Sequence, residues 1–461
     1  MTFRKNLSWF AALFFVIGTV DAQSKPNVVL FFIDDLGWTD IGVNGSTFHE
    51  TPNIDALAAS GVNFKRSYAA NPVCSPTRAA LMTGKAPQRV GITQWISSDK
   101  VSLALSEVTI GEAFLEAGYR TGYIGKWHLG KLDNVQPQHQ GFQYTCAVNR
   151  AGQPRSFFYP FGKGKAKSAV PDLASYQKGD YLTDALTDKA IEFIDTEGEE
   201  PFFLCLSHYA VHTPIQAPKD LVQKYVAKKI ELYGDGKAET IEEKYQTLST
   251  VRQEFPEYAA MMENLDTNIG RVVDRLNEKG LLENTILVFT SDNGGLAHRK
   301  REINPTSNAP LRSGKAWTYE GGIRIPTIVS WQGQIESTTS EALIITMDLY
   351  PTLLDLCDVP LKPEQHLDGK SLKNLLKGDV APDADRRVLA WTYPHVHGSG
   401  HKPSDAIISN DWKLIRFASD EPDELYHLSE DIGEQNNLAQ KHPEKVQELK
   451  KQLDQWLEET I

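Results

Sequence analysis

Short apolar runs alternate with longer amphipathic segments over most of the chain. The runs have the length of buried strands and lie at 27–33, 119–125, 201–207, 285–290 and 324–331. Segments with helical periodicity lie between them, at 53–60, 109–117 and 257–279. Strands that alternate with helices predict an α/β fold, in which helices cover both faces of a large, mostly parallel sheet.

The pattern changes after about residue 379. The segments 388–393, 406–409 and 412–417 predict short antiparallel strands, and a polar helix is expected at 443–459. We therefore expect a main domain over 25–376 and a small C-terminal α+β subdomain with an antiparallel sheet over 387–461. The polar stretch 377–386 would separate them, and the Gly/Lys-rich segment 161–168 is expected to be a loop.

The first residues have the pattern of an export signal. Arg4 and Lys5 precede an apolar run from Trp9 to Val20, and Ala22 is the small residue at the expected cleavage site. A membrane anchor is the alternative, but the run is shorter than the ~20 residues that span a bilayer. We predict a signal peptide at 1–22 and an exported protein, periplasmic or secreted, without a membrane partner.

Composition narrows the classes of partner. Of the 461 residues, 41% are hydrophobic, which allows a sizeable core. The net charge of −12 argues against a nucleic-acid partner. The four cysteines are widely spaced and form no zinc pattern. They permit disulfides in an exported protein, but at least one stays unpaired if Cys74 has a chemical role.

Ionisable and amide side chains follow four of the predicted strands. In chain order they are Asp34 and Asp35, then Lys126 and His128, then His208 and His212, then Asp292 and Asn293. Because ligands bind beyond the carboxyl ends of parallel strands, we expect these groups at one edge of the sheet. His208 is expected to be structural.

Four of the side chains that follow these strands can bind a metal through oxygen, namely Asp34, Asp35, Asp292 and Asn293. Three converging carboxylates repel one another unless a cation lies between them. Oxygen ligation suits Ca²⁺ or Mg²⁺. The alternative is that these are turn and helix-cap residues, which are common after strands.

The segment Cys74-Ser-Pro-Thr-Arg78 predicts the start of a helix. Pro76 fits a first helical turn, so Cys74 is expected near a helix N-terminus, which attracts anions. Arg78 lies one turn further on and can reach back toward Cys74. A buried structural cysteine at an ordinary helix start is the alternative.

Two segments carry a family resemblance. Cys74-x-Pro-x-Arg78 continuing into Leu81-Met-Thr-Gly84, together with Gly125-Lys-Trp-His-Leu-Gly130, resembles the two signatures of the formylglycine-dependent, arylsulfatase-like sulfatases of the alkaline phosphatase superfamily. The resemblance covers about 26–368 and includes Asp34-Asp35, His212-Thr-Pro, Ser291-Asp-Asn-Gly294 and Gly314-Lys315, and 412–437 is similar to the family's C-terminal end. It implies an alkaline-phosphatase-like α/β/α sandwich, with 25–376 as the catalytic sulfatase domain.

The resemblance also implies a mechanism. A maturation enzyme, as a partner, oxidises Cys74 to formylglycine, and the hydrate attacks sulfur with one hydroxyl and expels sulfate with the other. One Ca²⁺ per chain is held by Asp34, Asp35, Asp292, Asn293 and the modified Cys74. The other catalytic residues implied are Arg78 and Lys126, which steady the hydrate, His128, which accepts its proton, and His212 and Lys315, which hold the ester oxygens and protonate the leaving alcohol.

The expected substrate is a sulfated carbohydrate, because export favours a polymeric or extracellular substrate. The side chains expected to bind it are Lys126, His212, Lys315, Arg150 and His395. The histidines at 395, 397 and 401 are interpreted as sugar contacts rather than a transition-metal site, and Trp95, Trp317 and Tyr319 are candidates for stacking on a sugar ring. Two alternatives stay open: a phosphoesterase or phosphonate hydrolase of the same superfamily, and a glycan-binding relative that never acquires the aldehyde.

Overall fold

The computed structural model describes residues 25–162, 169–299, 304–379, 387–418 and 421–461. The predicted signal peptide at 1–22 lies outside these residues, as do most of the loop at 161–168 and most of the boundary at 377–386. Within the described ranges, every helix is too short or too polar to cross a membrane.

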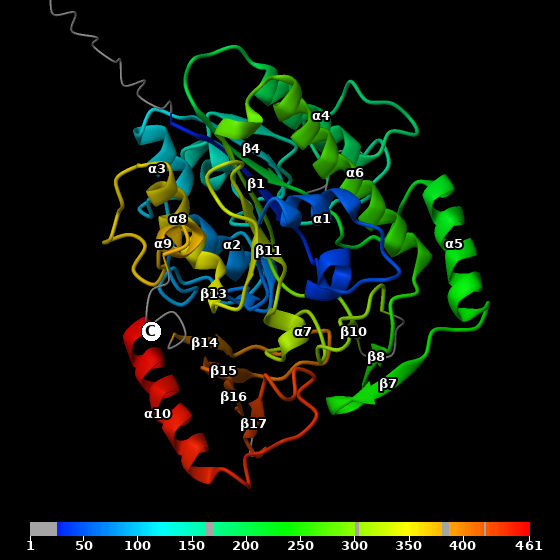
Figure 1. The fold of residues 1–461 in the computed structure, drawn as a ribbon, viewed down its shortest axis with the longest axis vertical. Coiled ribbons are helices and arrows are strands. Elements are labelled where there is room, and N and C mark those ends of the chain that lie inside the picture. Colours follow the sequence, from blue (N-terminus) through cyan, green and yellow to red (C-terminus); the bar gives the residue numbers. More distant parts are fainter. Residues whose placement is uncertain (1–24, 163–168, 300–303, 380–386, 419–420) are drawn as a thin grey trace, which may run out of the picture.

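An eight-stranded sheet forms the centre of the molecule (Figure 1). In sheet order its strands are β12 (Thr338–Ser340), β2 (Gly61–Phe64), β11 (Thr327–Ser330), β9 (Thr285–Ser291), β1 (Asn27–Ile33), β6 (Phe202–Ser207), β4 (Arg120–Gly125) and β5 (Tyr144–Cys146). The strands from β9 to β5 are mutually parallel. Their carboxyl ends therefore meet at one edge of the sheet.

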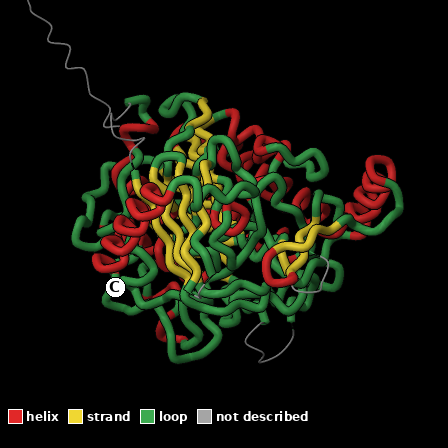
Figure 2. Tube along the Cα trace, turned by 90° about the horizontal axis from the view of Figure 1, so that it is seen from below, coloured by secondary structure: helices red, strands yellow, loops and turns green. Residues whose placement is uncertain are grey.

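Both faces of this sheet are buried, as the fully apolar sequence of β1 requires. Alternate residues of β1 pack into two separate cores, one on each face. Helices α1 (Pro52–Ala59), α4 (Leu182–Asp195), α5 (Lys219–Tyr233) and α6 (Pro256–Glu278) close one core. Helices α2 (Cys74–Thr83), α3 (Ile110–Glu116), α8 (Leu349–Leu356) and α9 (Lys373–Leu376) close the other. Figure 2 shows the strands between helices on both sides, and the predicted α/β/α sandwich is confirmed.

One predicted strand differs from the observed one. The apolar run at 324–331 forms β11 only over Thr327–Ser330, and β11 runs antiparallel to both β9 and β2. An apolar run predicts a buried strand but contains no information about its direction. The carboxyl end of β11 consequently lies at the edge opposite to the candidate site.

The C-terminal part of the chain forms its own antiparallel sheet. Its strands, in order, are β14 (Val388–Tyr393), β15 (Ser404–Ser409), β16 (Trp412–Phe417) and β17 (Glu424–His427). Helix α10 (Pro443–Thr460) packs on one face of this sheet through Val446, Leu449 and Leu453. The predicted small α+β unit with an antiparallel sheet is thus confirmed, whereas the domain boundaries stay a prediction.

Two smaller sheets complete the fold. One consists of β10 (His298–Arg299), β8 (Thr247–Thr250) and β7 (Thr240–Glu243), and the other of β13 (Ile344–Ile345) and β3 (Ser67–Tyr68).

A buried ion cluster joins the C-terminal sheet to the rest of the molecule. The Nζ atom of Lys413 on β16 lies 2.9 Å from Glu320 Oε1 and 2.8 Å from Glu434 Oε1. Glu320 begins the short helix α7 (Glu320–Ile323), five residues after Lys315. All three charged groups are fully buried, so breaking one contact would leave an uncompensated charge. The cluster therefore fixes the C-terminal sheet beside the segment that carries Lys315.

Candidate active site

Four neighbouring parallel strands deliver the predicted side chains to one edge of the sheet. The order β9, β1, β6 and β4 is unbroken, and the polar segments that follow these strands are therefore adjacent in space. Gly125 ends β4 with φ of +96°, and a Cβ there would lie 2.0 Å from the carbonyl oxygen of Ser207. Only glycine permits this close turn, which directs Lys126 toward the carboxylates.

Cys74 is the first residue of helix α2 and faces the end of β4. Its Sγ atom lies 3.3 Å from His128 Nδ1. The next residue, Ser75, donates to the carbonyl oxygen of His128 and accepts from the backbone N–H of Ile96. His128 Nε2 in turn lies 3.2 Å from the carbonyl oxygen of Ile96. These contacts fix Cys74, His128 and the 92–97 loop as one unit.

Arg78 connects the helix to the sheet edge. Its Nε donates to Asp292 Oδ2 at 2.8 Å, and its NH2 lies 2.8 Å from the same oxygen. Its NH1 donates to the carbonyl oxygen of Lys126 and to Ser207 Oγ. Arg78 is fully buried, so its guanidinium group orients Asp292 and Lys126 rather than contacting solvent.

Two buried lysines neutralise the first pair of carboxylates. Lys126 Nζ lies 2.6 Å from Asp34 Oδ1, and Lys315 Nζ donates to Asp35 Oδ1 at 2.5 Å. Asn293 Nδ2 also donates to Asp35 Oδ1, at 2.8 Å. The backbone N–H of Asp35 donates to Asp292 Oδ1. All four oxygen-bearing residues proposed as metal ligands therefore form one connected cluster.

Several oxygens of this cluster accept no hydrogen bond from the described residues. They are Oδ2 of Asp34, Oδ2 of Asp35 and Oδ1 of Asn293, and all are buried. The other carboxylate oxygen of Asp34, Oδ1, is paired with Lys126. Burial raises the pKa of Asp34 well above its ordinary range, and the negative charges of Asp292 and Asp35 raise it further, against the opposing effect of Lys126. Buried, unpartnered oxygens of this kind are the ligands that a hard divalent cation satisfies. Ligand atoms of Asp34, Asp35 and His212 also lie within 4.8 Å of one another.

Both histidines at the site have a lowered pKa, and the position of the proton on the His212 ring follows from its hydrogen bond. His212 Nδ1 lies 2.8 Å from the carbonyl oxygen of Thr213, which can only accept, so the Nδ1 atom carries the proton. Its Nε2 atom lies 3.6 Å from Asp35 Oδ2. Burial lowers the pKa of His212 to about 3, although Asp35 opposes this effect. Burial also lowers the pKa of His128, and Lys126 and Arg78 lower it further.

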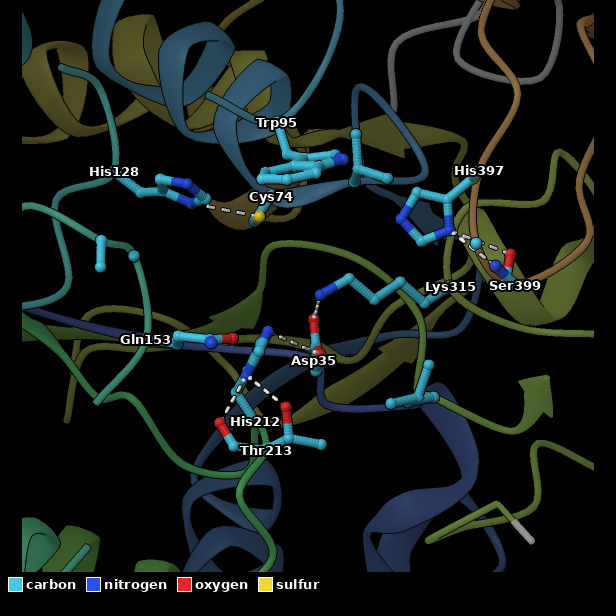
Figure 3. A pocket seen from close by; sticks show the side chains of 15 residues that line it. Asp35, Cys74, Trp95, His128, Gln153, His212, Thr213, Lys315, His397 and Ser399 are labelled. Atoms are coloured by element: carbon cyan, nitrogen blue, oxygen red, sulfur yellow. Dashed lines mark hydrogen bonds and ion pairs between the residues drawn. The ribbon is translucent and has the colours of Figure 1, made fainter. Parts of the chain in front are cut away.

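A cavity of about 460 Å³ opens above this cluster (Figure 3). Cys74, His128, Asp35, His212 and Lys315 line its inner end. Its outer walls come from distant segments of the chain and include Trp95, Gln153, Thr213, Leu296, His397 and Ser399. Reactive groups at the inner end and mixed apolar and polar walls are typical of a small-molecule site.

The structure brings most of the predicted site residues together, but not all candidates for substrate binding. Arg150 lines a neighbouring hollow and pairs with Asp133 on the surface. His395 does not line the cavity and instead contacts Thr93 Oγ1 at 3.0 Å. Trp317 and Tyr319 are buried and stacked on each other, because they belong to the core beneath the C-terminal sheet. They are therefore unavailable for stacking on a sugar.

Other functional candidates were not found from the sequence. Gln153 and Ser399 line the cavity, and Ser207 holds Arg78 and the carbonyl oxygen of Lys126. Gln153 and Ser399 lie in loops without a recognisable motif, so no pattern could have singled them out. Ser207, in contrast, ends a predicted strand directly before His208, and this position was a usable signal.

Replacing Arg78 with methionine should lower the free energy of unfolding in a calcium chelator by about 3–5 kcal/mol. The reason is that Asp292 would remain buried without its guanidinium partner. Urea denaturation measures the change. The matched control is Arg150→Met, which removes an exposed ion pair with Asp133 and should cost less than about 1 kcal/mol. Equal losses in the two variants would contradict the assigned role of Arg78.

Comparisons with known proteins agree with this geometry. The family model described as Sulfatase matches residues 26–359, and the model described as N-sulphoglucosamine sulphohydrolase, C-terminal, matches 313–461. A sulfatase of Formosa agariphila is 31% identical, over 92% of this chain and 86% of the relative. The N-acetylgalactosamine-6-sulfatase of Mus musculus is 32% identical, over 78% of this chain and 68% of the relative.

A solved structure shows the same similarity in three dimensions. The crystal structure of Ps i-CgsB in complex with k-i-k-neocarrahexaose superposes with a TM-score of 0.78 at 29% sequence identity. The match covers 94% of this chain and 93% of the other.

The parallel sheet and the acidic edge with its cavity place the molecule in the class of alkaline-phosphatase-like hydrolases. Within that class, the chain belongs to the sulfatase family, and the resemblance seen in its two signature segments is confirmed. It is a sulfuric ester hydrolase.

Proposed function

We propose that this protein is an exported, calcium-dependent sulfatase that removes sulfate from a carbohydrate by means of a formylglycine formed from Cys74. The observation that carries the proposal is the position of Cys74. It lies at the start of a buried helix and at the inner end of a cavity, beside the carboxylates of Asp34, Asp35 and Asp292.

The proposed calcium ligands are Asp34, Asp35, Asp292, Asn293 and the modified side chain at position 74. The buried, unpartnered oxygens of Asp34, Asp35 and Asn293 fit a hard cation. A bound calcium ion would withdraw electron density from the sulfate oxygens and lower the pKa of the nucleophilic hydroxyl. Lys126 and Arg78, which contact Asp34 and Asp292, would hold the ligand set in place.

The environment of Cys74 supports its conversion rather than its use as a thiol. Burial raises the pKa of the Cys74 thiol, with Lys126 and Lys315 opposing this effect. A neutral thiol is a weak nucleophile. The hydrate of formylglycine would supply oxygen nucleophiles instead. His128, with Nδ1 at 3.3 Å from the Cys74 sulfur, is the nearest group able to take up their proton.

The geometry favours Lys315 over His212 as the proton donor to the leaving alcohol. A neutral His212 carries its proton on Nδ1, where the carbonyl oxygen of Thr213 accepts it. Asp35 raises the pKa of Lys315 above its ordinary value despite burial, so the ammonium form is present at neutral pH. Lys315 would then protonate the ester oxygen. The unprotonated Nε2 of His212 can only accept a hydrogen bond, so His212 would orient a neighbouring donor, such as a sugar hydroxyl, rather than the ester oxygen itself.

A sulfated carbohydrate is the proposed substrate class. One relative is named for action on N-acetylgalactosamine 6-sulfate, and Ps i-CgsB was crystallised with an oligosaccharide. The outer cavity also has the mixed lining that a sugar requires, with one large aromatic ring and several hydrogen-bonding groups. Export is proposed from the signal-like residues 1–22.

Sulfate release from a panel of defined sulfated mono- and disaccharides tests the proposed function. Protein produced with a formylglycine-generating maturation enzyme should release sulfate from at least one sugar. It should leave a phosphate diester of similar shape intact. Hydrolysis of aryl sulfates alone would refute the carbohydrate assignment while preserving the sulfatase assignment.

Removal of calcium should abolish activity and lower the thermal stability of the protein. A ligand that binds only the native state at 100 times its dissociation constant stabilises it by about 2.7 kcal/mol. Thermal unfolding and sulfate release should therefore be measured with a calcium chelator, and again after excess calcium is restored. Full activity and an unchanged unfolding temperature in the chelator would show that the oxygen cluster holds no required cation.

A further inference from the structure

The outer cavity contains a second group of side chains whose function the proposed mechanism does not explain. His397 and Ser399 belong to the loop between β14 and β15, so the C-terminal sheet supplies one wall of the cavity. Trp95 lines another part of the same cavity and is drawn above Cys74 in Figure 3. The ring that carries the sulfate must lie in this space, because the sulfur has to reach position 74.

The loop that carries His397 is held firmly. The backbone N–H of His397 donates to the carbonyl oxygen of His401, and that of Gly400 donates to the carbonyl oxygen of His397. His401 is buried against the rings of Trp317 and Tyr393. His395 contacts Thr93, which connects the loop to the segment that carries Trp95. The two walls are therefore fixed relative to each other.

The hydrogen bonds of His397 determine which ring nitrogen carries the proton. The backbone N–H of Ser399 donates to Nδ1 at 3.1 Å, so Nδ1 is an acceptor. In the neutral ring, the proton is therefore on Nε2. Figure 3 shows this second nitrogen facing the cavity. Burial lowers the pKa of His397 to about 4, and the ammonium group of Lys315 lowers it further, so the ring is neutral near pH 7.

Beyond the inner end beside residue 74, where the sulfate to be cleaved would lie, the described cavity walls carry little positive charge. Among its described lining residues, Lys315 is the one lysine or arginine, and its charge is already paired with Asp35. The remaining polar groups, Gln153, Thr213 and Ser399, are neutral. Trp95 remains 41% exposed and offers a flat surface on which a sugar ring can stack.

We propose that His397 and Trp95 form a subsite for the sugar ring that carries the sulfate, in which His397 donates from Nε2 to an uncharged oxygen of that ring. The subsite consequently selects rings with a single anionic group. A second sulfate or a carboxylate on the same ring would lose its water, and the described lining residues offer no unpaired cation in exchange. This inference rests on the proposed carbohydrate sulfatase activity and specifies its substrate class.

The test compares sugar monosulfates with the disulfates that carry the extra group on the same ring. Wild-type enzyme should hydrolyse a monosulfate with a kcat/KM at least about tenfold above that of its disulfate, which corresponds to about 1.4 kcal/mol. His397→Ala should raise KM for the monosulfate by about tenfold and reduce this preference. His397→Lys, which introduces an ammonium group, should shift the preference toward the disulfate.

The control is Val396→Ala, in the same loop but exposed and outside the cavity lining. It should leave the preference unchanged. A wild-type enzyme that hydrolyses disulfates as well as monosulfates would overturn the inference without any variant, and so would a His397→Ala enzyme that keeps the wild-type preference. If no sugar sulfate is hydrolysed while aryl sulfates are, the proposed carbohydrate function fails as well, and the two failures are thereby distinguished.

Discussion

Replacing Cys74 with alanine is expected to reduce sulfate release by roughly 10⁴-fold or more, to the level of the uncatalysed background. The reason is that alanine cannot be converted to an aldehyde and offers no nucleophile above the carboxylate cluster. Folding should be retained. Cys74 is a small side chain, and its truncation should cost only about 1 kcal/mol of stability.

Cys357→Ala is the matched control, because Cys357 is also buried but lies at the end of α8, outside the cavity lining. It should lose a similar amount of stability and keep full activity. Mass spectrometry of the wild-type peptide that contains residue 74 should show a mass about 18 Da below that of the cysteine form. An active enzyme with an intact thiol at this position would refute the formylglycine assignment.

Replacing Lys315 with methionine should lower kcat/KM for a sugar sulfate by about 10²–10⁴-fold. A sugar alkoxide is a poor leaving group and requires the proton that we assign to Lys315. 4-Nitrophenyl sulfate has a good leaving group that departs without protonation, so the same variant should lose much less activity toward it. Parallel assays with the two substrates measure this difference.

The control for this variant is Lys362→Met. It removes a lysine that pairs with Glu116 and does not line the cavity. It should leave both activities unchanged. Equal losses on the two substrates in Lys315→Met would instead assign Lys315 to sulfate binding or to the position of Asp35. A selective loss in His212→Ala, with Lys315→Met active, would exchange the two proposed roles.

The sequence predicted the strands and helices of the central sandwich well, because their apolar spacing reflects burial directly. The strands at 27–33 and 285–290 are examples that the structure reproduces within a residue, and the strand at 388–393 of the C-terminal sheet is reproduced equally well. The direction of β11 could not be predicted, because burial does not depend on strand direction. The same limit applies to Trp317, whose apolar ring suits both a core and a sugar site.

The inner end of the site was also accessible from the sequence, since parallel strands collect the residues that follow them at one edge. The outer cavity was not. His397 and His395 lie two residues apart in one loop, yet only His397 lines the cavity. Their different orientations depend on the hydrogen bonds of His397 to Ser399 and of His395 to Thr93. Contacts of this kind depend on how the C-terminal sheet lies against the main sheet.

The burial of helix α2 restricts when Cys74 can be modified. Every residue from Cys74 to Thr83 is buried, and Cys74 and Arg78 expose only 3% and 1% of their surface. An enzyme that has to bind this segment of the backbone therefore has no access to it in the folded protein. On the proposed formylglycine chemistry, oxidation of Cys74 would have to precede folding, while this stretch is still extended. A maturation enzyme added to purified, folded protein should therefore leave the thiol unchanged.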